Sequence, residues 1–278
     1  MNVFRTKKTA PVTTSSAEIR LYAPRSWNEL SQDQLRYVIT LLAMFPEDTD
    51  KVKTYMFVRF TGIEIIDRYL KYFRCRYTPP GSSRKQVFML RRATVVNFLS
   101  SFDYIDDFTN MDVRLDGVCG LQAVDKYMHG VAFIDYLNAE TAFQSYLLTQ
   151  DDSCLVDLLH ILYRPKPKKK GLGRLRHKAA PQAADLLAAF LWYGFVIKGS
   201  FASAFPNFFR KTTDKESSGD IDIVGMINSE IRALTEGDIT KEEKIYKMDC
   251  WRALTELDAK AREAREMQRM MDKNNAQK

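Results

Sequence analysis

The most constraining feature of the sequence is the apolar run at residues 183–197, in which Asp185 is the only charged residue. Apolar side chains fall on every side of such a helix, a pattern typical of a helix buried inside a protein. The run is shorter than the roughly 20 residues of a membrane span. Gly199 is expected to end the helix. The run therefore predicts a sizeable helical core and no membrane segment.

The rest of the composition agrees with a globular protein of the cytoplasm. Hydrophobic residues make up 45% of the 278 residues, enough for one large core or two small ones. The four cysteines and three histidines lack the short spacing of a zinc site, which favours free thiols in a reducing compartment. Residues 1–16 contain no apolar region typical of a secretion signal. We expect no cofactor and no bound metal.

Hydrophobic periodicity predicts a mainly α fold, a multi-helix globular bundle with one or two short β-strands in the N-terminal half. Ser31 and Gln34 form a capping box that begins one helix, and Thr240 and Glu243 form a second. The expected helices cover residues 31–45, 50–61, 64–76, 94–102, 121–148, 152–162, 182–197, 200–209, 221–234 and 241–271. For the stretch at 121–148, a break near Gly130 is the alternative. The expected strands cover residues 18–22 and 86–90.

The same pattern divides the chain into four parts. Residues 1–17 are expected to form a disordered basic arm, and residues 18–163 an N-terminal helical domain. A basic linker or loop at 164–180, rich in Pro, Gly and Lys, separates this domain from a C-terminal helical region at 181–278. The last helix of that region becomes densely charged beyond its apolar first turns, so its end is expected to be exposed or partner-bound.

The basic linker carries eight Lys or Arg residues and no acid, whereas the net charge of the chain is +7. Such a cluster can contact the phosphates of a nucleic acid without sequence preference, since it contains no aromatic side chain for base stacking. A solvated loop or an acidic protein partner are the alternatives. The basic residues are Arg164, Lys166, Lys168, Lys169, Lys170, Arg174, Arg176 and Lys178.

Asp220 and Asp222 allow an enzyme hypothesis. Metal-dependent nucleotidyltransferases hold divalent metals with an Asp-x-Asp pair that follows a Gly-Ser turn, for which Gly199-Ser200 is the candidate here. The gap between the turn and the pair is longer than in that family, and the residues after Asp222 have a helical pattern. Helix capping by either aspartate explains the pair without a metal. We therefore expect no enzyme activity.

The C-terminal part resembles proteins of tailed phages and prophages. Gly237-Asp238-Ile239-Thr240-Lys241 links two helices, and the second helix carries Cys250-Trp251-Arg252-Ala253-Leu254-Thr255-Glu256-Leu257 before its charged tail. This arrangement is similar to that of tail-assembly-chaperone-like proteins. Trp27-Asn28-Glu29-Leu30-Ser31, Leu162-Tyr163-Arg164-Pro165 and Phe190-Leu191-Trp192-Tyr193-Gly194 look similar to proteins from phages of gut Bacteroidota.

The resemblance implies a non-enzymatic role in tail morphogenesis, in which the chain binds the tape-measure protein or another tail protein. The location would be the host cytoplasm or the virion, and a structural virion component is the nearest alternative. Aromatic and aliphatic anchors on a helix carry much of the energy of such an interface. We therefore expect Trp251, Leu254 and Leu257 to contact the partner.

Overall fold

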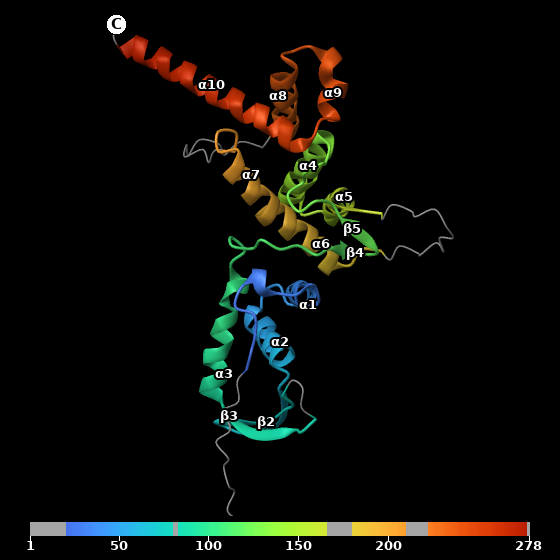
Figure 1. Cartoon of the computed structure of the whole chain (residues 1–278), viewed down its shortest axis with the longest axis vertical. Helices are drawn as coiled ribbons and strands as arrows, with labels where there is room; N and C mark the ends of the chain where they lie inside the picture. The colour runs from blue at the N-terminus through green and yellow to red at the C-terminus, as the bar shows by residue number, and fades with distance from the viewer. Residues whose placement is uncertain (1–20, 80–82, 166–179, 210–221, 277–278) are drawn as a thin grey trace, which may run out of the picture.

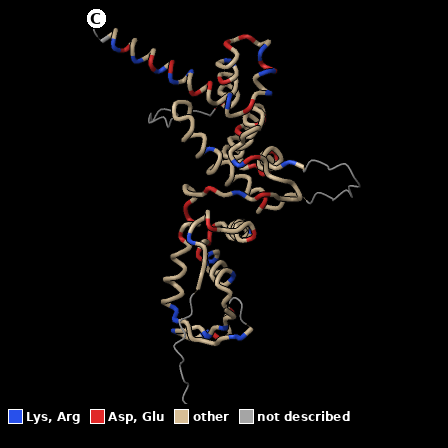
Figure 2. Tube along the Cα trace, viewed as in Figure 1, with Lys and Arg blue, Asp and Glu red and all other residues tan. Residues whose placement is uncertain are grey.

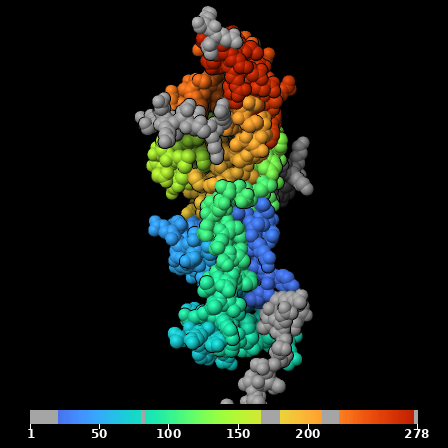
Figure 3. All heavy atoms as spheres, turned by 90° about the vertical axis from the view of Figure 1, so that its left-hand side faces the viewer, coloured from blue at the N-terminus to red at the C-terminus, as the bar shows by residue number. Residues whose placement is uncertain are grey.

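A computed structural model describes residues 21–79, 83–165, 180–209 and 222–276 of the chain. The fold is mainly α-helical with short strands in the N-terminal half, as the sequence predicts. The strands form two three-stranded sheets, more than the one or two strands expected. Figures 1 and 3 show an elongated molecule with a β-sheet at one end and the C-terminal helix at the other.

The N-terminal part of the fold begins with the 3-10 helix η1 (Trp27–Glu29), followed by two predicted helices, α1 (Gln32–Met44) and α2 (Thr49–Thr61). We call residues 27–106 the first lobe. Ser31 forms the predicted capping box at the start of α1: its hydroxyl accepts the Gln34 N–H at 3.3 Å, and the Gln34 side chain accepts the Ser31 N–H at 2.9 Å. Gly62 ends α2 in the left-handed region, with φ of 68°. The remaining elements of this lobe are β1 (Glu64–Arg68), β2 (Tyr72–Tyr77), β3 (Gln86–Arg91), α3 (Arg92–Leu99) and the 3-10 helix η2 (Ser100–Asp106).

The prediction of a helix at 64–76 is wrong, because this segment forms the β1–β2 hairpin. Strand β2 lies between β1 and β3 and pairs antiparallel with both. Its side chains alternate, with Phe73, Cys75 and Tyr77 turned inward and the intervening residues outward. The short apolar run fits both a helical and a strand period, and pairing with the correctly predicted strand β3 decides between them.

Residues 117–164, which we call the second lobe, contain β4 (Gly117–Val118), β5 (Leu121–Ala123), α4 (Phe133–Thr149), α5 (Asp152–Leu162) and β6 (Tyr163–Arg164). The helix expected from 121 begins only at Phe133. Strand β5 pairs with β4 and β6, and a turn follows in which the Asp125 carboxylate accepts the N–H groups of Tyr127 and His129, each at 3.0 Å. Gly130, with φ of 70°, ends the turn. This side-chain bonding competes with helix formation.

The apolar run forms the centre of the molecule. Helix α6 (Ala183–Leu191), the π-helical segment η3 (Trp192–Ile197) and α7 (Lys198–Ala204) are continuous, so the helix expected to end at Gly199 reaches Ala204. Of the Phe-rich helix expected at 200–209, residues 200–204 are helical but belong to this continuous helix, and residues 205–209 form a turn. Helix α6 packs against α1 and α5, and described residues on both sides of the basic linker belong to one apolar core.

This central helix is one feature that a membrane protein would share. Within the described residues, Ala183–Ala204 spans 22 residues and is long and apolar enough to cross a membrane. A core helix of a globular protein has the same composition. Here Trp192, Tyr193, Ile197 and Phe201 are completely buried by neighbouring elements of the chain.

The C-terminal part comprises α8 (Ile223–Thr235), the 3-10 helix η4 (Ile239–Lys241), α9 (Glu242–Tyr246) and α10 (Cys250–Ala276). The single helix expected at 241–271 is therefore interrupted, and Asp238, not Thr240, caps its first turn by accepting the Thr240 N–H at 3.0 Å. The interruption lies at 247–249, where the Phe133 N–H donates to the Met248 carbonyl at 2.8 Å.

Two further hydrogen bonds hold this interruption against the start of α4. The Cys250 N–H donates to the Val131 carbonyl at 2.8 Å, and the Gly130 N–H donates to the Asp249 carboxylate at 2.7 Å. Backbone groups used in this way are not available to continue α9 into α10. The basic arm at 1–17 lies outside the described residues, as does most of the strand expected at 18–22, whose described residues form no strand.

Candidate functional site

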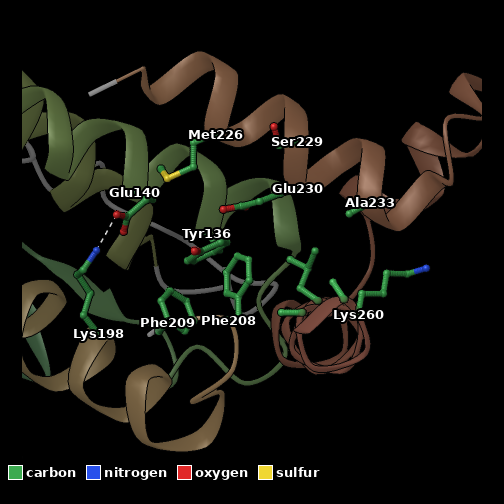
Figure 4. Close-up of a pocket in the computed structure, with 13 residues that line it drawn as sticks. Tyr136, Glu140, Lys198, Phe208, Phe209, Met226, Ser229, Glu230, Ala233 and Lys260 are labelled. Carbon is green, nitrogen blue, oxygen red and sulfur yellow. Dashed lines mark hydrogen bonds and ion pairs between the residues drawn. The ribbon is translucent and has the colours of Figure 1, made fainter. Parts of the chain in front are cut away.

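A groove of about 610 Å³ lies between α8 and α10 (Figure 4). Helix α8 lines it with residues at helical spacing: Met226, Ser229, Glu230 and Ala233. Helix α10 forms the facing wall with Leu257, Lys260, Ala261 and Ala264. Two amphipathic faces thus meet across an open space, and most of their groove-lining side chains are small or apolar.

Aromatic residues form the floor of this groove, which we call the α8–α10 groove. Tyr136 of α4 lies beside Phe208 and Phe209 of the turn after α7. The turn is fastened to α10 because the Asp258 carboxylate accepts the backbone N–H groups of Asn207 at 2.7 Å and Phe208 at 2.9 Å. The positions of Phe208 and Phe209 on this floor are therefore set by α10 itself.

Glu140 anchors a buried polar network at one end of the groove. Its side chain is only 6% exposed and accepts hydrogen bonds from the Tyr193 hydroxyl at 2.8 Å, the Lys198 ammonium at 2.6 Å and the Gln144 amide at 2.7 Å. A buried carboxylate with three donors, one of them cationic, is fully compensated. Glu140 therefore holds α4 and α7 together.

Glu230 faces the same groove without such compensation. It is 7% exposed, and its Oε2 atom accepts no hydrogen bond from any residue that the structure describes. Burial raises the pKa of Glu230 to about 8, and the nearby charge of Glu140 adds to this effect while Lys198 opposes it. The carboxyl group is therefore protonated at neutral pH.

Sequence reasoning missed both glutamates, although a signal was present. Each occupies an apolar face at helical spacing: Glu140 follows Tyr136 and Leu137, and Glu230 follows Met226 and Ile227. A charged residue on the buried face of an amphipathic helix requires a partner or an altered protonation state. The spacing of apolar residues around an acid is therefore enough to single out such a position.

Beyond the groove, α10 projects from the body of the molecule (Figures 1 and 3). Among the described residues, Arg265 makes the last hydrogen bond from α10 to another part of the chain, donating to the Asn207 side chain at 3.0 Å, and residues 266–275 are all exposed. At about 100° per residue, Met271 continues the face of Leu257 and Ala264, whereas Met270 points about 130° away from that face. The groove thus leads onto an exposed methionine of the projecting helix.

The expected contact residues pack inside the protein instead of forming an exposed surface. Leu254 is 0% exposed and Leu257 3%, and only Leu257 reaches the groove wall. Trp251 is half-buried: its indole N–H donates to the Tyr127 carbonyl at 2.6 Å, and its ring stacks on His129 with centroids 4.2 Å apart. An amphipathic pattern predicts which face of a helix is buried, but it does not predict whether that face is buried by the same chain or by a partner protein.

Of the basic linker residues, Arg164 forms an ion pair with Asp135 at 2.6 Å, and the other seven lie outside the described residues. Asp220 lies outside them too. Asp222 caps α8 by accepting the Gly225 N–H at 2.8 Å, as the capping hypothesis predicts. No group of three His, Cys, Asp or Glu in the described part of the chain is arranged to hold a metal ion.

Comparisons of the chain with protein-family models, with curated proteins and with solved structures found no match. Function is therefore inferred from the α8–α10 groove, the projecting helix and the distribution of charge.

Proposed function

We propose that the chain is a non-enzymatic factor of phage tail morphogenesis, a tail assembly chaperone or a related virion assembly protein. In this proposal the α8–α10 groove holds an amphipathic helix of the tape-measure protein. The observation that carries the binding role is the groove with two helical walls, which leads onto the exposed Met271 of α10. The assignment to tail assembly rests on the resemblance of the C-terminal sequence.

The chemistry of the groove suits a helix as its occupant. Small residues on both walls, namely Ser229, Ala233, Ala261 and Ala264, allow a third helix to approach closely, because the distance between packed helices depends on the side chains at the contact. Met226 and Met271 add flexible apolar side chains that adapt to different partner surfaces. A helix laid in such a groove presents apolar residues at i, i+3, i+4 and i+7.

Replacing Met271 with Glu should weaken capture of the tape-measure protein about tenfold, because the change places a charge on the apolar face that α10 shares between Leu257, Ala264 and Met271. Met270→Glu is the matched control, since Met270 is the neighbouring residue and is also exposed, at 65% against 52% for Met271, but on another face of α10. Co-purification with a candidate tape-measure protein would measure both. Equal losses in the two variants, or no loss in either, would contradict the use of this face.

A second candidate function, binding of nucleic acid, is favoured by the charge of the β1–β3 sheet. Residues 64–92 contain eight Lys or Arg and two acids, so the basicity of the chain is not confined to the linker. Figure 2 shows these basic residues gathered at the sheet end of the molecule. Arg74 and Arg91 are exposed, with Tyr72 beside Arg91 in the strand register. Tyr72 could stack on a base and the arginines could contact phosphates.

This second candidate predicts a binding constant for generic DNA that falls steeply with salt. Arg74→Gln with Arg91→Gln should lower the slope of log K against log salt by about one to two, because each lost phosphate contact releases one counterion fewer. Lys273→Gln on α10 is the control and should leave the slope unchanged. Gel shifts at several salt concentrations provide the measurement, and binding that does not depend on salt would exclude this function.

A further inference from the structure

The unpaired carboxyl of Glu230 is a feature that helix binding alone does not explain. An unsatisfied buried polar group destabilises a fold, and such groups are rare unless a ligand, a water molecule or a function accounts for them. Glu230 lies in a cavity with Tyr136, Phe208 and Phe209 as aromatic neighbours. Figure 4 shows its side chain reaching from α8 toward Tyr136.

The other charged residues of the cavity have partners of opposite charge. Lys198 pairs with Glu140 at 2.6 Å, and Lys260 pairs with Glu236 at 3.4 Å and with Glu256 at 3.8 Å. Among the charged lining residues that the structure describes, Glu230 alone lacks such a partner. When Glu230 is ionised, its Oε2 atom needs a hydrogen-bond donor, and a cationic donor would also balance the negative charge.

The walls of the cavity specify this donor further. Aromatic faces attract cations through their quadrupoles, and three aromatic side chains line this site. The apolar wall at Leu257 and Met226 suits an aliphatic stem. A positive group at the end of a flexible hydrocarbon chain meets these conditions, and both lysine and arginine have this form. The single unpaired Oε2 atom suits the compact ammonium group of lysine better than the five donors of a guanidinium group.

We propose that this cavity binds the ammonium group of a lysine on the partner helix, with the Glu230 carboxylate as its counter-ion. The proposal rests on the proposed function, because it names the anchor residue of the helix held in the α8–α10 groove. The lysine stem would lie along the aromatic floor, and its ammonium group would donate to the Oε2 atom that is otherwise unpaired.

Binding of the lysine ammonium group should depend on pH, because it requires the Glu230 carboxyl group to be ionised. Glu230 of the empty cavity is protonated below its pKa of about 8, so an incoming ammonium group displaces one proton to solvent. The facing groups are Tyr136 and Glu140 of α4, Lys198 of α7 and Lys260 of α10. Burial raises the pKa of Tyr136 well above its usual value, so Tyr136 stays neutral, while Glu140, Lys198 and Lys260 each have a partner of opposite charge. The displaced proton therefore comes from Glu230.

Titration of the full chain with hexylammonium, and with hexanol as its neutral analogue, tests the cavity directly. At pH 8 we expect hexylammonium to bind at least about tenfold more tightly than hexanol, and its affinity to fall about tenfold per pH unit between pH 8 and pH 6. Calorimetry in buffers of different ionisation enthalpy should report release of nearly one proton below pH 7. Glu230→Gln should remove both the preference and the pH dependence, whereas Glu243→Gln, whose side chain is exposed on α9, should preserve them.

Equal binding of the two probes, or a preference that survives Glu230→Gln, would overturn the cation site. Capture of the tape-measure protein supplies the second arm: Glu230→Gln should weaken capture as Met271→Glu does. Binding of hexylammonium without this effect would assign the cavity to a free amine and overturn the lysine anchor. Failure of Met271→Glu to affect capture would instead remove the proposed function, while the probe titration would stand by itself.

Discussion

Replacing Trp251 and Leu254 together with alanine should lower the free energy of unfolding by about 5–8 kcal/mol, which is comparable to the total stability of many domains. Leu254 is completely buried, so its truncation leaves a cavity. Trp251 packs against Phe201 and Phe205 with ring centroids 5.7 Å and 5.2 Å apart, and it closes the turn at Tyr127 through its indole N–H. The double variant therefore loses core packing and one partly buried hydrogen bond.

Denaturant unfolding followed by circular dichroism would measure this loss. Met270→Ala on the exposed part of the same helix is the control and should change the free energy of unfolding by less than about 0.5 kcal/mol. A double variant with wild-type stability but weaker capture of a partner would contradict the burial described above. Such a result would restore these residues as a contact surface.

Replacing Glu230 with Gln should raise the free energy of unfolding at pH 8 and leave it nearly unchanged at pH 5. The pKa of Glu230 is raised in the folded state, from 4.5 to about 8, so the unfolded chain ionises first as pH rises. The contribution of this group to stability is fully present below pH 4.5 and is lost as pH rises toward 8. The loss between pH 5 and pH 8 amounts to about 3–4 kcal/mol.

Unfolding curves at pH 5, 6, 7 and 8 would isolate this effect as the difference between wild type and variant. Several aspartates, including Asp125 and Asp258, have pKa values lowered below 3.8, so their contributions change only in a more acidic range. The facing residues Glu140 and Lys198 form an ion pair in both proteins. A difference that stays constant over this pH range would show that Glu230 is ionised in the folded protein.

Local signals predicted several helices correctly, and long-range pairing explains the errors. The capping box at Ser31 and the leucine spacing of α5 need only neighbouring residues, so α1 and α5 were predicted well. The hairpin at 64–77 depends on pairing with β3, which a periodicity argument does not include. The break before α10 depends on backbone groups of Val131 and Phe133, more than a hundred residues earlier in the chain.

The site shows a similar division between what was predicted and what was not. The sequence directed attention to the start of α10, which does form one wall of the groove through Leu257. It did not identify α8 as the facing wall or Tyr136 as part of the floor, because these residues meet only through tertiary packing. The sequence alone could have identified Glu230 as an unusual residue, since it shows an acid on an otherwise apolar helix face.

Helix α10 is held by hydrogen bonds at its start and as far as Arg265, so its free end can transmit a force to the body of the protein. Its 27 residues extend about 40 Å, and its first turn is pinned to Gly130, Val131 and Phe133 at the start of α4. The far end has no bracing from the described chain beyond Arg265. A load applied near Met271 therefore bends the unbraced end of the helix against the contacts that Asp258 and Arg265 make with the turn at 205–209, so the strain reaches Phe208 and Phe209 on the floor of the α8–α10 groove.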